Sequence, residues 1–77
     1  MQVHVRLFAS LRERLGFGDR TVLVEDGQTI LDIWNTITGN VEVPPNVLMA
    51  VNQAYAPPDT RVSDGDEIAF FPPVTGG

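Results

Sequence analysis

Residues 29–39 read TILDIWNTITG, and they are the most informative segment for the fold because they form the one strongly amphipathic helix predicted from the sequence. Its apolar residues recur at the i, i+3, i+4, i+7 spacing of a single buried face: Ile30, Ile33, Trp34 and Ile37. Thr29 is placed to cap the helix, with Asp32 in the capping-box position. Gly39 stands where a left-handed glycine closes a helix. One such helix predicts one sheet packed against it, with Trp34 in the core.

Four strands are predicted around this helix, at residues 2–7, 20–25, 48–52 and 67–71. The first, QVHVRL, alternates apolar and polar side chains, which is the period of a half-buried strand and puts His4 on the solvated face. Residues 9–15 predict one or two helical turns that stop at Gly16.

The predicted order is strand, strand, helix, strand, strand, which is an α+β chain. A hairpin, a crossover helix and a parallel return strand give a small mixed sheet that clasps the helix, the β-grasp arrangement. We expect residues 1–71 to form this domain, with the first and last strands as neighbours. Residues 72–77 are expected to be a flexible C-terminal tail.

Composition excludes several functions. The 77 residues include no cysteine, which removes disulfides, cysteine-based zinc sites and a cysteine nucleophile, and a single histidine, His4, makes no zinc site alone. The formal net charge of −5 disfavours nucleic acid as a partner. No membrane segment or signal peptide is apparent, so we expect a cytoplasmic protein. A chain this short is a poor candidate for an enzyme with its own deep pocket.

Asp64 and Asp66 flank Gly65, and two carboxylates across a glycine turn have two interpretations. They are a pair of metal ligands, or they are turn formers whose side chains bond to the backbone. The absence of further ligands nearby favours the turn, and no metal site is predicted.

Strand alternation locates a candidate surface. If Ile68 and Phe70 face the helix, Ala69 and Phe71 face outward, and Phe8 points outward at the end of the first strand. Because the first and last strands are expected to be neighbours, Phe8 and Phe71 form an exposed aromatic patch. Such patches mark partner sites, although a phenylalanine at a strand end also turns inward in some proteins.

The tail reads PPVTGG and carries the most reactive candidate group. Gly76 and Gly77 lack Cβ atoms and so pass through a channel too narrow for other residue pairs. Gly77 also presents an unhindered α-carboxylate. Pro72 and Pro73 stiffen the base, so the tail projects, reaching at most roughly 20 Å beyond Phe71. The alternative is an ordinary frayed terminus.

The chain resembles the ubiquitin-like sulfur carriers of the MoaD/ThiS family, and among them the small subunits of molybdopterin synthase, over nearly its full length. The resemblance rests on Phe8-Ala9 with Leu11-Arg12-Glu13, on AVNQ at residues 50–53, and above all on DGDEIAFFPPVTGG at residues 64–77. Residues 18–47 match only in pattern.

The resemblance implies that an ATP-dependent, E1-like activating enzyme adenylates Gly77 and that a sulfur donor then makes a terminal thiocarboxylate. The sulfur is passed to a pyranopterin precursor of the molybdenum cofactor, in a pocket of the large synthase subunit. This chain would thread Pro72, Pro73, Val74, Thr75 and Gly76 into that subunit, contact it through Phe8 and Phe71, and bind no cofactor itself. A heterotetramer with two copies of each subunit is expected.

Three alternatives stay open. A sulfur carrier of the thiamine pathway shares the Gly-Gly end, although the Phe-Phe-Pro-Pro stretch favours the pterin pathway. A ubiquitin-like modifier would conjugate to lysines of other proteins through Gly77. An interaction module without covalent chemistry is a third possibility.

Overall fold

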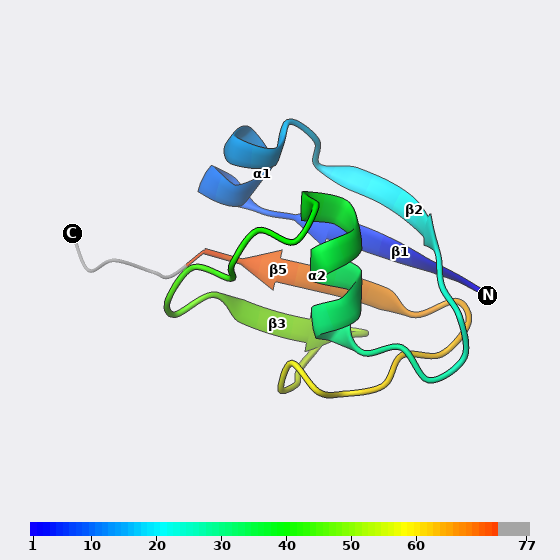
Figure 1. Ribbon diagram of the computed structural model, residues 1–77. Coiled ribbons are helices and arrows are strands. Elements are labelled where there is room, and N and C mark those ends of the chain that lie inside the picture. Colours follow the sequence, from blue (N-terminus) through cyan, green and yellow to red (C-terminus); the bar gives the residue numbers. More distant parts are fainter. Residues whose placement is uncertain (73–77) are drawn as a thin grey trace.

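This computed structural model describes residues 1–72. They form a mixed five-stranded sheet that helix α2 crosses on one face (Figure 1). The elements are β1 Gln2–Leu7, α1 Ala9–Leu15, β2 Asp19–Leu23, α2 Ile30–Thr38, β3 Leu48–Val51, β4 Ala54–Tyr55 and β5 Glu67–Phe71. Among these residues no helix has the length and apolarity that crossing a bilayer requires. The predicted tail lies outside the described residues from residue 73 onward.

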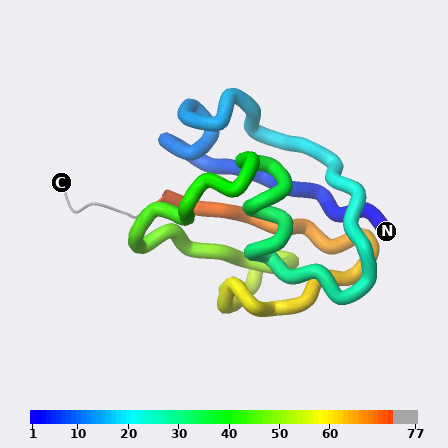
Figure 2. Tube along the Cα trace, in the orientation of Figure 1, coloured from blue at the N-terminus to red at the C-terminus, as the bar shows by residue number. Residues whose placement is uncertain are grey.

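The strand order β2-β1-β5-β3-β4 confirms the predicted β-grasp sheet. β1 pairs antiparallel with β2 and parallel with β5, so the first and last strands of the chain lie side by side in the sheet (Figure 2). The parallel return strand is β5; β3, which follows the crossover helix, is antiparallel to β5. Parallel pairing brings the ends of β1 and β5 to the same end of the sheet, with Leu7 opposite Phe70.

Helix α2 begins and ends where the sequence predicts. The Thr29 hydroxyl accepts a hydrogen bond from the Asp32 backbone N–H at 3.2 Å, and the Asp32 carboxylate accepts one from the Thr29 backbone N–H at 2.9 Å. Aspartate therefore completes the capping box although glutamate is more usual. Gly39 adopts φ of +71°, and its N–H donates to the carbonyl of Asn35.

The core fills the space between α2 and the sheet. Its largest fully buried side chains are Trp34, Phe70, Ile30, Ile33, Ile68, Val3 and Val5. Trp34 packs edge-on against Phe70 at 5.1 Å and donates its indole N–H to the carbonyl of Val41 at 2.7 Å. Trp34 is thus the core residue that its helical position predicts, whereas Ile37 is only partly buried at the edge of the core.

The turn between β3 and β4 carries two residues with positive φ, Asn52 at +49° and Gln53 at +71°. Two positive φ values in a two-residue hairpin loop define a type I′ turn, whose preferred sequence is Asn-Gly. The side-chain oxygen of Asn52 accepts a hydrogen bond from the Glu67 backbone N–H at 2.9 Å, and its side-chain NH₂ donates one to the Asp66 carboxylate at 2.9 Å. The Asn52 side chain therefore connects the turn to the start of β5.

We expect Gln53→Gly to stabilise the protein by about 1 kcal/mol, because glycine adopts the left-handed conformation without the cost that a Cβ imposes. Asn52→Gly should instead destabilise it, because the two side-chain hydrogen bonds are lost. Urea unfolding of the two variants checks this. Equal shifts in the same direction would show that backbone strain, and not the Asn52 side chain, controls the turn.

Candidate functional site

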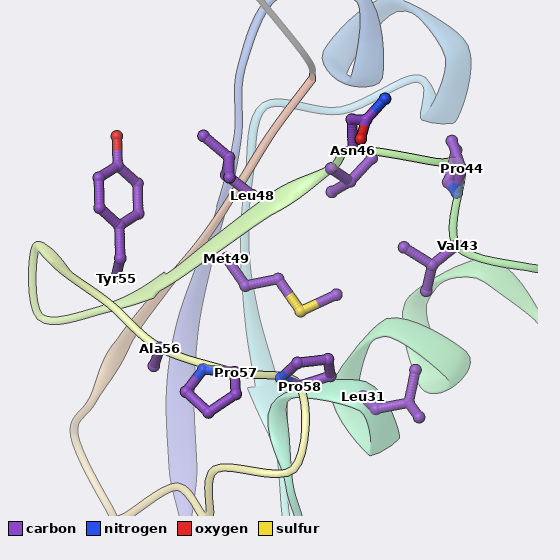
Figure 3. Close-up of a pocket in the computed structure, with 11 residues that line it drawn as sticks. Leu31, Val43, Pro44, Asn46, Leu48, Met49, Tyr55, Ala56, Pro57 and Pro58 are labelled. Carbon is purple, nitrogen blue, oxygen red and sulfur yellow. The ribbon is translucent and has the colours of Figure 1, made fainter.

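The sheet face away from α2 is the candidate site. The core side chains of β1, β3 and β5 point toward α2, and the residues that alternate with them point the other way. Figure 3 shows this for β3, where Met49 points toward Leu31 of α2 and Leu48 points to the opposite side. We call this surface the helix-free face; its central residues are Arg6, Leu48, Ala50, Tyr55, Glu67, Ala69 and Phe71.

Three aromatic rings gather at one end of the helix-free face. Phe8 and Phe71 stack with ring centroids 4.7 Å apart and an interplanar angle of 10°. Tyr55 packs edge-on against Phe71 at 6.3 Å and is 74% exposed. These three residues are the aromatic cluster. Leu48, opposite Phe71 in the ladder and 43% exposed, extends its apolar surface.

The structure therefore brings Phe8 and Phe71 together as strand alternation predicts. Each ring is half-buried and not fully exposed, because the two rings cover one another. Sequence reasoning missed Tyr55, which lies on the two-residue strand β4, and Leu48, whose facing follows only from the ladder with β5.

Charged side chains lie beside the aromatic cluster. The Arg6 guanidinium approaches Asp19 at 3.5 Å and Glu67 at 3.4 Å, and it lies 5.4 Å from the centre of the Phe8 ring. His4 Nε2 is 3.0 Å from Asp19. All four charged or titratable groups are partly exposed, so these pairs contribute little to stability. Their position on the helix-free face matches a role in recognition better than a role in folding.

Asp64 and Asp66 bond to the backbone around them. Asp64 accepts the Gln2 N–H at 2.8 Å, and Asp66 accepts the Ser63 N–H at 2.7 Å together with the Asn52 side-chain amide. Asp64 thus connects the turn before β5 to the start of β1, and Asp66 connects it to the β3–β4 turn. This arrangement supports the turn interpretation of the pair.

A hollow of about 550 Å³ lies between α2 and the edge of the sheet (Figure 3). Its wall includes Leu31, Met49 and three prolines, Pro44, Pro57 and Pro58. Most of its lining residues are apolar, and among them only Tyr55 and Asn46 carry a polar side chain.

Pro72, the last described residue, follows β5 directly and is half-buried. The aromatic cluster therefore lies at the root of the tail. The predicted roles of Pro73, Val74, Thr75, Gly76 and Gly77 lie outside the described residues and stay predictions.

The model of the ThiS family matches residues 5–77, from the middle of β1 to the Gly-Gly end. The chain belongs to the ThiS family. It is 36% identical over 81 residues to the molybdopterin synthase sulfur carrier subunit of Escherichia coli K12, covering 97% of this chain and 99% of that protein.

Solved structures of ThiS-like proteins agree on the fold. SAMP1 from Haloferax volcanii has a TM-score of 0.87 at 27% identity, with full coverage of both chains. A chain of the complex of subunits 1 and 2 of the molybdopterin-converting factor from Helicobacter pylori has a TM-score of 0.67, also at 27% identity and full coverage. The ubiquitin-like β-grasp fold is thereby confirmed.

Proposed function

We propose that this ThiS-family protein is the sulfur carrier subunit of a molybdopterin synthase. Similarity to subunits of that name over nearly the full length supports this, as does the C-terminal sequence FFPPVTGG. The observation that carries the proposal is the stacked Phe8–Phe71 pair on an uncovered sheet face, directly before the Gly-Gly tail. In the sequence, five residues thus join the apolar docking surface, which ends at Phe71, to the reactive terminus at Gly77.

Gly77 carries the chemistry in this proposal. Its carboxylate attacks the α-phosphorus of ATP in an E1-like activating enzyme, and pyrophosphate leaves. A sulfur donor then displaces AMP from the acyl-adenylate, which leaves a thiocarboxylate at Gly77. Activation is needed because an unmodified carboxylate would have to expel a poor leaving group.

The thiocarboxylate sulfur then displaces an oxygen substituent of the pyranopterin precursor inside the large subunit, which supplies the catalytic pocket. Water hydrolyses the resulting acyl–sulfur bond, so that the sulfur stays on the pterin and the Gly77 carboxylate is regenerated. The small subunit is a sulfur donor and not an enzyme by itself. The H. pylori structure of subunits 1 and 2 together supports a partner of this kind. Two copies of each subunit, and a cytoplasmic location, remain part of the proposal.

A ubiquitin-like modifier is the second candidate, favoured by the TM-score of 0.87 to a small archaeal modifier protein. It would form an isopeptide bond between Gly77 and a lysine of another protein. Lysine is absent from this chain, so the modifier could not build isopeptide-linked polymers on its own side chains. A carrier of the thiamine pathway is a third candidate that shares the terminal chemistry.

Phe71→Ala should weaken binding to the large subunit by about 2 kcal/mol, or roughly 30-fold, because a central interface aromatic is lost. The measurement is calorimetric titration of the purified small subunit into the large subunit. Phe71 is half-buried at the end of β5, so the variant should stay folded.

Leu31→Ala is the control, since Leu31 is 38% exposed on α2, which lies on the opposite face of the sheet from the aromatic cluster. It should bind like wild type. A change below about twofold for Phe71→Ala would remove the aromatic cluster from the interface, and an unfolded variant would assign Phe71 to the core.

A further inference from the structure

A second hollow, of about 280 Å³, opens on the helix-free face between the aromatic cluster and the charged side chains. Ala50 and Ala69 form its floor; they are opposite one another in the β3–β5 ladder and only 3% and 6% exposed. Phe8, Phe71 and Tyr55 stand around it, with Glu67 and Arg6 at its polar side. We call this hollow the alanine socket.

The alanines create the socket. Alanine is a poor strand former, and two of them sit opposite one another on central strands where β-branched residues would pack better. Each larger side chain at these positions would fill the hollow. The chain therefore lacks a stabilising larger side chain at both Ala50 and Ala69, on the face that carries the aromatic cluster. The space that this leaves is consistent with a site for a side chain of a partner.

Within residues 1–72, the carboxylate on the polar side of the socket has acceptor capacity to spare. The Glu67 carboxylate contacts Arg6 through one oxygen at 3.4 Å, at the long end of a hydrogen bond. The backbone N–H of Glu67 donates to the Asn52 side chain at 2.9 Å, so the β3–β4 turn holds the backbone of Glu67 in place independently of Arg6. A carboxylate accepts up to about four hydrogen bonds, which leaves most of its capacity free.

Aromatic rings next to a carboxylate make a binding site suited to a guanidinium. Arginine stacks on ring faces and pairs with carboxylates through a planar fork of donors. The chain already shows this chemistry internally, since Arg6 contacts both the Phe8 ring and Glu67. The net charge of −5 adds attraction for a cationic group.

We propose that the alanine socket receives one arginine side chain of the protein partner, which lies against the Phe71 and Tyr55 rings and pairs with Glu67. The proposal rests on the proposed function in that the helix-free face binds the large subunit. In this arrangement Arg6 competes with the partner's arginine for the Glu67 carboxylate, and the hydrogen bond from Arg6 to Glu67 weakens when the partner binds.

Arg6 and Glu67 variants test this with opposite expectations. Glu67→Gln should weaken binding of the full-length protein to the large subunit about tenfold, and the remaining affinity should depend less on salt. Arg6→Gln should leave affinity unchanged or raise it, because Glu67 is freed. Ala69→Val should weaken binding by filling the socket while leaving thermal stability equal or higher. Asp26→Asn, which removes an exposed carboxylate from the loop before α2, is the control.

Two results would overturn the arginine assignment. If Ala69→Val weakens binding but Glu67→Gln does not, the socket takes an apolar side chain. If Arg6→Gln weakens binding as much as Glu67→Gln, Glu67 acts only by positioning Arg6. If Phe71→Ala weakens binding while all socket variants bind normally, the proposed interface stands and the socket proposal fails. Normal binding of Phe71→Ala as well would remove the helix-free face from the interface altogether.

Discussion

Deleting Gly77 abolishes sulfur transfer while leaving the fold and partner binding intact. This result is expected because the deletion moves the terminal carboxylate back by one residue, about 3.5 Å along an extended chain. Reacting atoms have to approach within about 3–3.5 Å, so a displacement of this size takes the carboxylate out of reach. Adenylation by the activating enzyme and dithiolene formation in the reconstituted synthase are the two measurements.

A one-residue extension beyond Gly77 should have the same effect, because it replaces the reactive carboxylate by a peptide bond. The same extension placed before Met1 is the control and should be tolerated, because the N-terminus lies at the other end of β1 from the aromatic cluster. Normal product formation with a blocked C-terminus would end the assignment of Gly77.

Gly76→Val should reduce product formation by orders of magnitude while partner affinity falls far less. The physical reason is that a β-branched side chain does not enter a channel shaped for glycine, whereas docking depends on the helix-free face. Affinity by calorimetry and product formation by the reconstituted reaction have to be measured separately on the same protein.

Gly76→Ala gives the graded comparison, since it adds a single methyl group, and its loss of activity should lie between wild type and Gly76→Val. Parallel losses of affinity and activity would mean that the tail contributes to docking. No loss in either quantity would mean that the channel accepts side chains and that glycine serves another purpose.

The sequence was sufficient to predict the elements whose apolar residues repeat over several positions. Helix α2 has a full apolar face and both caps within eleven residues, and β1 alternates strictly. The adjacency of β1 and β5 followed from the β-grasp arrangement. The predicted second strand, residues 20–25, ends two residues later than β2 does, because Val24 remains buried after the ladder ends.

Strand β4 could not be predicted, since two residues are too few to show the alternation of apolar and polar side chains that marks a strand. It exists because Asn52 and Gln53 adopt the left-handed conformation without glycine, and the bonds from Asn52 to the β5 region hold that turn. Tyr55 was missed for the same reason.

The candidate site was predictable in part. Phe8 and Phe71 followed from alternation, but the alanine socket depends on the register that sets Ala50 opposite Ala69. Register is a property of paired strands and not of either strand alone. The charges around Arg6 likewise come from three different strands.

Whether Gly77 carries sulfur is best tested by intact-mass analysis of the protein isolated from its native cell. We expect a population that is heavier than the encoded chain by the difference between one sulfur and one oxygen atom. Fragmentation should assign the added mass to the terminal glycine. Alkylation of the thiocarboxylate should increase the mass of this population by the mass of the added alkyl group. An unmodified terminus in cells that actively make the cofactor, or Gly77 found only in isopeptide bonds to lysines of other proteins, would contradict the assignment of sulfur to Gly77.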